Sequence, residues 1–174
     1  MEDERIDALR QLLGARRCRL NPPLDEDAIA EFERRYGIQL PAAYRTFLLV
    51  MGNGGKGPPE DGVVRLGEVP EYMSSEEQAI WGDLGRLSKP FPFTGPWVWE
   101  DEENSAEGSH EQVAWGSLRL GNDGCGQYWH LIVTGAERGH IWMFTGEGIV
   151  PTVPRRDFVS WYTDWLRGVD DWWG

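Results

Sequence analysis

The sequence predicts an α+β fold: a central, mostly antiparallel sheet packed with N-terminal helices and a C-terminal helix. Apolar residues recur with helical spacing in the first 51 residues and again after residue 156. Between them, short aromatic and β-branched runs at residues 113–144 are separated by glycine turns, which is typical of antiparallel strands. The 174 residues, 40% of them hydrophobic, suit a single domain over residues 1–174.

Two amphipathic helices are expected first. One spans residues 2–13, and the next begins after Asp25, a favourable N-cap, and ends at Gly37. Their apolar faces comprise Ile6, Leu9 and Leu13 in the first helix and Ile29, Phe32 and Tyr36 in the second. The connection between them contains Arg16, Arg17 and Arg19, which we interpret as a solvated basic loop or an internal partner for acidic residues elsewhere.

A third helix is expected to begin at Pro41, because proline suits the first helical position. Its buried stripe comprises Tyr44, Phe47, Leu48 and Met51. Residues 52–55, Gly-Asn-Gly-Gly, end it, since glycine and asparagine enter left-handed conformations at low cost. Residues 63–66 have the composition of a short strand.

Residues 67–112 are expected to form an acidic insertion within the domain. Pro, Gly, Ser and acidic residues dominate it, with one helical turn or more expected at residues 76–80. A disordered segment would not carry so many aromatic residues, so these are expected to pack inward while the carboxylates face outward. The aromatic residues are Trp81, Phe91, Phe93, Trp97 and Trp99.

The negative charge is concentrated in this part of the chain. Residues 60–111 carry 13 acidic and 3 basic residues, a net charge of −10 out of −12 for the whole chain. The acidic run comprises Glu100, Asp101, Glu102, Glu103, Glu107 and Glu111. This charge argues against nucleic acid or an anionic membrane as a partner and favours a basic protein. The alternative is that the acidity only keeps the protein soluble.

Three strands are expected at residues 113–120, 127–133 and 140–144. Both faces of the second are apolar, which predicts cover on both sides of the sheet. Residues 134–139 form a hairpin loop, and residues 149–154, with two prolines, indicate an edge strand or an extended connector. A last helix is expected between Asp157 and Gly168, with its apolar face formed by Phe158, Trp161, Tyr162, Trp165 and Leu166.

Two glycine-rich stretches resemble known ligand loops but do not match them. Residues 52–57 lack the spacing of a phosphate-binding loop, and Gly57 follows Lys56 where serine or threonine is required. Residues 121–126 contain too few carboxylates for a calcium loop, and a tight hairpin turn explains them better. We therefore expect no nucleotide, metal or other cofactor.

A Cys–His nucleophile pair is the strongest enzyme alternative. Cys125 precedes His130 by five residues, but no third orienting group stands at recognisable spacing. His130 and His140 are better explained as packed or solvated residues. We therefore expect a protein that is not an enzyme.

The remaining features indicate a cytoplasmic protein. Cys18 and Cys125 are too few for a disulfide framework, which favours free thiols in a reducing compartment. The first residues are charged from position 2, unlike a secretory signal, and no apolar run approaches the ~18 residues of a membrane span.

Two blocks of the sequence resemble the SUKH superfamily, which includes fungal cell-wall assembly regulators and many bacterial immunity proteins. The first is an acidic amphipathic helix followed by Leu-Pro, a tyrosine and Asn-Gly-Gly. The second is a glycine turn between strands within residues 118–144. The matching positions include Leu40, Pro41, Tyr44, Asn53, Gly54, Gly55, Gly121 and Gly124.

This resemblance implies helices around a central mixed sheet and a structural role for the motif residues. It also implies an immunity protein that neutralises a cognate polymorphic toxin, often a nuclease. The acidic run, with Trp97 and Trp99 as aromatic anchors, would then bind that basic partner. The alternative is a cytoplasmic regulatory or scaffold module that binds endogenous proteins, as in the fungal branch.

Overall fold

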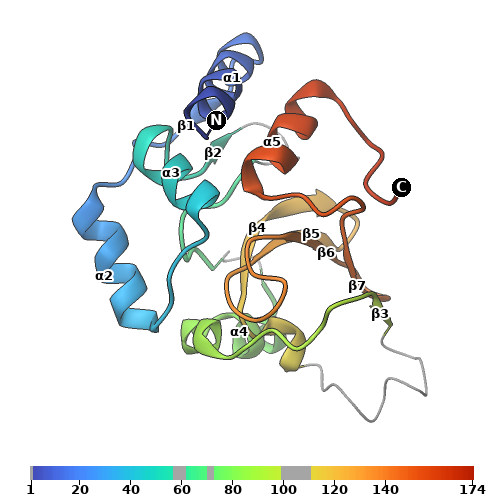
Figure 1. Cartoon of the computed structure of the whole chain (residues 1–174). Helices are drawn as coiled ribbons and strands as arrows, with labels where there is room; N and C mark the ends of the chain where they lie inside the picture. The colour runs from blue at the N-terminus through green and yellow to red at the C-terminus, as the bar shows by residue number, and fades with distance from the viewer. Residues whose placement is uncertain (1, 57–61, 70–72, 99–110) are drawn as a thin grey trace.

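The computed structural model describes residues 2–56, 62–69, 73–98 and 111–174. Figure 1 shows its helices and strands along the chain. The helices are α1 (Glu2–Ala15), α2 (Glu26–Tyr36), α3 (Ala42–Val50), α4 (Ser75–Trp81) and α5 (Phe158–Arg167), with 3₁₀ turns η1 (Leu84–Ser88) and η2 (Gln112–Ala114). The strands are β1 (Arg19–Leu20), β2 (Gly55–Lys56), β3 (Trp97–Val98), β4 (Ser117–Gly124), β5 (Gln127–Ile132), β6 (Ile141–Phe144) and β7 (Gly148–Pro151).

The predicted α+β class is confirmed. Five strands form one antiparallel sheet in the order β3-β7-β6-β5-β4, and β1 and β2 form a separate two-stranded antiparallel ribbon. In Figure 1, α1, α3 and α5 lie on one side of the sheet and α4 lies on the other. The described strands pair antiparallel throughout, where the resemblance implied a mixed sheet.

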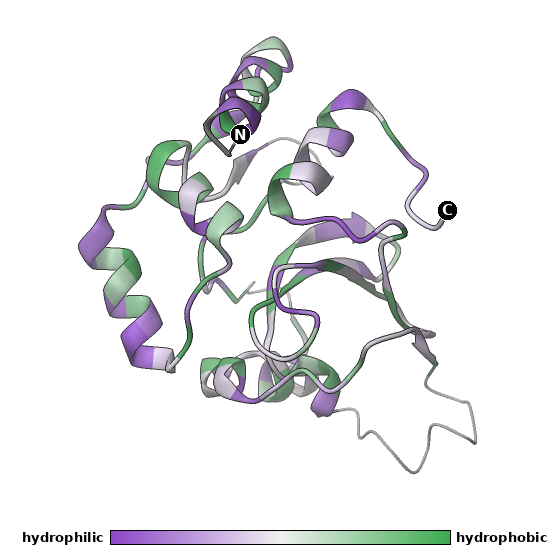
Figure 2. Cartoon of the chain, in the orientation of Figure 1, coloured by the Kyte–Doolittle hydropathy of each residue, from purple (hydrophilic) through white to green (hydrophobic). Residues whose placement is uncertain are grey.

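The main core lies between the sheet and the helices α1, α3 and α5. Successive residues of β5 and β6 face opposite sides, so Trp129 and Leu131 enter this core while His130 and Ile132 do not. Phe47 of α3 contacts Phe158 of α5 with ring centroids 4.7 Å apart. Figure 2 shows polar and apolar residues mixed along α1 and α2, as expected for helices with one buried face.

A second, aromatic core covers the other face of the sheet. Phe91 and Trp97 pack there with Trp142 and Phe144, and Trp81 and Phe93 pack against them at the margin. The inward packing expected for the aromatic residues of 67–112 is therefore confirmed where the structure describes them, and Trp99 lies outside the described residues. Strand β5 is covered on both faces, as its composition predicted.

The predicted caps hold for α2 and α5. Asp25 accepts a hydrogen bond from the Ala28 N–H at 2.8 Å, and Asp157 accepts one from Ser160 N–H at 2.9 Å. Gly37 and Gly168 end the two helices in left-handed conformations. Pro41 is the N-cap of α3 and not, as predicted, its first helical residue. Its ψ of 137° is extended, and the helix begins at Ala42.

Three predictions about individual strands are wrong. Residues 112–114 form η2, so the strand begins at Ser117 and not at residue 113. Residues 63–66 contain only an isolated bridge from Val63 to Gly55. Of the two alternatives for residues 149–154, the edge strand is wrong, because β3 pairs with β7 on the outside. Among the described residues, no helix is both long and apolar enough to cross a bilayer.

Candidate functional site

The Asn-Gly-Gly motif brings three chain segments into close contact. Gly54 has φ 67° and Gly55 has φ 145°. A Cβ atom would lie 2.4 Å from the Val63 carbonyl oxygen at Gly54 and 2.3 Å from the Arg19 carbonyl oxygen at Gly55. Only glycine permits this approach, so the motif does more than end α3.

Asn53 joins the same segments through hydrogen bonds. Its Oδ1 accepts from the Leu66 N–H at 2.8 Å, and its backbone carbonyl accepts from Asn21 Nδ2 at 2.9 Å. The Asn21 N–H in turn donates to the Gly54 carbonyl at 2.8 Å. The motif residue therefore fixes the connectors on either side of the β1–β2 ribbon.

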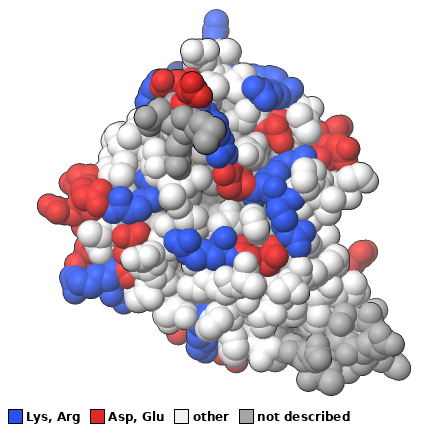
Figure 3. All heavy atoms as spheres, viewed as in Figure 1, with Lys and Arg blue, Asp and Glu red and all other residues white. Residues whose placement is uncertain are grey.

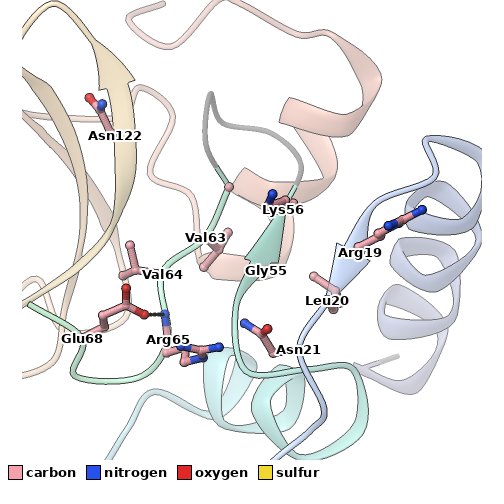
Figure 4. A pocket seen from close by; sticks show the side chains of 11 residues that line it. Arg19, Leu20, Asn21, Gly55, Lys56, Val63, Val64, Arg65, Glu68 and Asn122 are labelled. Atoms are coloured by element: carbon pink, nitrogen blue, oxygen red, sulfur yellow. Dashed lines mark hydrogen bonds between the residues drawn. The ribbon is translucent and has the colours of Figure 1, made fainter. Parts of the chain in front are cut away.

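These segments border a groove of about 520 Å³, shown in Figure 4. Its charged lining residues are Arg19 of β1, Lys56 of β2, and Arg65 and Glu68 of the segment after β2. Its amide side chains are those of Asn21 and Asn122. We call this feature the basic groove. Its cations and amides can bind an anionic or hydrogen-bonding partner.

The Leu-Pro and tyrosine positions of the motif serve the core. The Leu40 N–H donates to Glu33 Oε1 at 2.8 Å, which fixes the turn between α2 and α3. The ring of Tyr44 is fully buried and lies 4.8 Å from that of Phe158. Burial raises the pKa of the Tyr44 hydroxyl above its usual value. Leu40 and Tyr44 thus contribute to the turn between α2 and α3 and to the main core.

The second motif block forms a hairpin, but its turn is shorter than predicted. Strand β4 continues through Gly121 to Gly124, with two register shifts, and Gly124 pairs with Gln127. Only Cys125 and Gly126 form the loop, with φ 49° and 75°. Two consecutive positive φ values match the I′ geometry that suits a right-twisted hairpin.

Most of the predicted partner-binding residues lie outside the described residues. These are Trp99, Glu100, Asp101, Glu102, Glu103 and Glu107. Glu111 is exposed, with one carboxylate oxygen 3.7 Å from Lys89 Nζ. Trp97 is only 6% exposed, because β3 packs its ring into the second core. Little of Trp97 is therefore available to anchor a partner in this conformation.

Other acidic residues of 67–112 have local roles in the structure. Glu77 forms a capping box with Ser74 at the start of α4. Asp83 accepts from the Gly85 N–H at 2.8 Å and caps η1, and Glu68 accepts from Arg65 N–H at 3.2 Å. On the face in Figure 3, acidic and basic side chains are interspersed. Described carboxylates thus stabilise turns as well as carry charge.

A cluster of buried polar side chains around Arg86 was not predicted from the sequence. Arg86 is 6% exposed and donates to the Ala114 carbonyl at 2.8 Å and to the Ser117 carbonyl. Burial lowers the pKa of Arg86 to about 10, while Asp83 opposes this shift. Arg119 of β4, which stands between apolar residues in the sequence, is buried as well, with 6% of its surface exposed.

His130 belongs to this cluster. It is 1% exposed, with Nδ1 3.4 Å from Ser117 Oγ and its ring stacked on Phe144 at 3.9 Å. Burial, then Arg119 and Arg86, hold its pKa well below the usual value. Cys125 is exposed in the hairpin loop, and no hydrogen bond joins it to His130.

Within the described residues, no group of three or more His, Cys, Asp or Glu side chains is arranged to hold a metal ion. Both cysteines are free thiols.

Comparison with known proteins places this architecture in a family. Neither the curated proteins nor the solved structures gave a match. The family model described as SMI1 / KNR4 family (SUKH-1) matches residues 23–164, from the residues before α2 to within α5. The match includes both motif blocks and the whole five-stranded sheet. The chain therefore belongs to the SMI1/KNR4 family (SUKH-1).

Proposed function

We propose that the protein is an immunity protein, which binds a cognate bacterial toxin and neutralises it by protein–protein contact. The observation that carries the proposal is the SUKH-1 family match over residues 23–164. Bacterial proteins that this sequence resembles are typically of this kind. In this proposal the protein acts in the cytoplasm, without catalysis or a cofactor of its own.

The charge of the chain supports a basic partner. The net charge is −12, and a nuclease toxin is basic where it holds phosphate. Opposite charges increase the rate of association and orient the encounter complex. An acidic inhibitor therefore suits a toxin with a nuclease site.

We propose that the acidic run supplies the main contact. Changing Glu100, Asp101, Glu102 and Glu103 to Lys is expected to leave the fold intact and to reduce toxin affinity at least 100-fold. A matched control changes four exposed acidic residues elsewhere by the same total charge: Asp27, Glu31, Glu147 and Asp170. Equal affinity losses in both variants would reject the acidic run as the site while leaving the function intact.

Co-expression tests the function itself. Each gene adjacent to this one is expressed alone and together with it, and growth and complex formation are measured. Toxicity of one neighbour, with rescue through a stable complex, is the expected result. Rescue without a complex, or no toxic neighbour, would reject the proposal and favour a regulatory or scaffold module that binds endogenous proteins.

A further inference from the structure

The basic groove carries positive charge that the described chain leaves unpaired. Its three cations are Arg19, Lys56 and Arg65, and none of their side chains makes an ion pair among the described residues. Glu68 is the one carboxylate among the lining residues, and it accepts from the backbone N–H of Arg65 and not from its guanidinium. Such a groove is unexpected in a protein whose net charge is −12.

Two of these cations oppose each other across the ribbon. Arg19 and Lys56 are direct partners in the antiparallel register of β1 and β2. Like charges at directly opposite positions destabilise a strand pair. The register of the ribbon brings these two residues together, and next to them the Gly55 backbone approaches Arg19 so closely that a Cβ atom would not fit. A ligand that supplies negative charge would remove the repulsion.

The arrangement of the cations indicates the shape of that ligand. Figure 4 shows Arg19, Lys56 and Arg65 on three different segments, with Asn122 of β4 on the far side. The positive charge is thus spread along a groove of about 520 Å³ and not focused on one point. A chain with several carboxylates suits cations that are carried on three separate segments.

The total charge of the protein distinguishes among polyanions. Nucleic acid carries about one charge per 1.7 Å of duplex, and a net charge of −12 would repel it at long range. A short acidic peptide carries few charges and hydrogen-bonds through its backbone, which suits the amide side chains of Asn21 and Asn122.

We propose that the basic groove binds a short, extended acidic segment of a partner protein. This surface goes beyond the proposed function and does not rest on it, because its charge is opposite to that of the acidic run. The groove is bordered by the family's Asn-Gly-Gly motif, so the motif positions a binding surface as well as a helix end.

The test measures binding of a fluorescein-labelled hexaglutamate peptide to the full-length protein at low salt. We expect salt-sensitive binding that weakens at least tenfold when Arg19→Glu and Lys56→Glu are combined. A control variant combines Arg35→Glu and Arg167→Glu, which change exposed cations outside the groove by the same charge and are expected to alter affinity less than twofold. Undetectable binding by the wild type, or equal losses in both variants, would overturn the proposal.

Thermal unfolding separates loss of a site from loss of the fold. Lys56→Glu places an opposite charge across from Arg19, so Tm is expected to rise by about 1–3 °C while peptide binding weakens. A lower Tm would contradict the like-charge argument. Inorganic phosphate is then added as a competitor. If it displaces the peptide more strongly than its ionic strength alone explains, the extended-segment assignment is overturned. Tighter binding of a single-stranded RNA oligonucleotide would overturn the choice of partner.

Discussion

Single residues determine how the N-terminal half is joined to the sheet. Gly54 and Gly55 allow the backbone of β2 to pass between that of β1 and that of Val63. Asn53 then fastens the flanking connectors through its side chain and its carbonyl. The order Asn-Gly-Gly follows from geometry. Position 53 needs a side chain that forms hydrogen bonds, and positions 54 and 55 have no room for a Cβ atom.

Gly54→Ala is expected to destabilise the protein by about 2–4 kcal/mol, because alanine at φ 67° is strained and its Cβ would displace the Val63 and Val64 carbonyls. Urea denaturation measures the change. Gly14→Ala is the control: Gly14 lies in α1 with open space around a Cβ, so this substitution should stabilise by about 0.5–1 kcal/mol. A loss at Gly54 of less than 1 kcal/mol would contradict the steric account.

His130 is expected to make stability depend on pH. Its folded-state pKa lies below the usual 6.5, so the unfolded chain binds more protons as pH falls. The contribution of His130 to the free energy of unfolding is therefore fully present above pH 6.5, and it is lost as pH falls towards and through the pKa of the folded state. The free energy of unfolding should decline from pH 7 to 5, and His130→Gln should flatten this decline by up to about 1.4 kcal/mol per pH unit. Equal slopes in the two proteins would show that another group is responsible.

Helices and strands follow largely from local sequence signals. Asp25, Gly37, Asp157 and Gly168 were identified as caps because their chemistry is local and their neighbours have helical periodicity. The end of β4 was mispredicted because Gly121 reads as a turn residue, whereas pairing with β5 extends the strand to Gly124. The pairing of strands depends on residues that are far apart in the sequence, and the spacing of apolar residues within one segment carries no information about it.

The predicted sites illustrate the same limit. The sequence indicated the acidic run from its composition, but it gave no reason to group Arg19, Lys56 and Arg65, which lie on separate segments. The burial of Arg86 likewise depends on carbonyl groups of Ala114 and Ser117, about thirty positions along the chain. Sites assembled from distant segments therefore required the structure.

The start of α5 is stabilised by a carboxylate with two roles. Asp157 caps the helix and pairs with Arg5 Nη2 at 2.5 Å. Burial acts to raise the Asp157 pKa, but the bonds from Arg5 and Ser160 outweigh it and leave the pKa below its usual value. Stability from this group is thus present above about pH 3.8 and is lost as pH falls through the folded pKa.

Asp157→Asn keeps the cap acceptor and removes the charge, so it should cost about 0.5–1 kcal/mol at pH 7, against about 1–2 kcal/mol for Asp157→Ala. The loss of stability in Asp157→Asn should disappear near pH 2, and urea denaturation at several pH values measures it. A deficit that persists unchanged at that pH would show that the ion pair is not its source.

The two central tryptophans of α5 should differ in energetic importance. Trp161 is fully buried and its ring lies 5.6 Å from that of Trp129, whereas Trp165 is only partly buried at the margin of the core. Trp161→Ala is expected to cost about 3–5 kcal/mol, and Trp165→Ala at least 1 kcal/mol less. The free energies of unfolding of the two variants decide this, and a larger loss at Trp165 would contradict the packing described.

At the scale of the whole molecule, the sheet separates two environments. One face carries the helical core that bears the family motif, and the other carries the aromatic core to which residues 73–98 contribute. Between β3 and η2 the chain passes through the acidic run, most of which lies outside the described residues.

The most direct test of this account is the affinity between the purified protein and the product of a toxic neighbouring gene, measured at low and at high salt. We predict a tight complex whose association rate falls at least tenfold as salt increases, because exposed charges guide the encounter. Absence of a complex would contradict the inhibitory function. A complex whose association rate is independent of salt would contradict the role given to the acidic run.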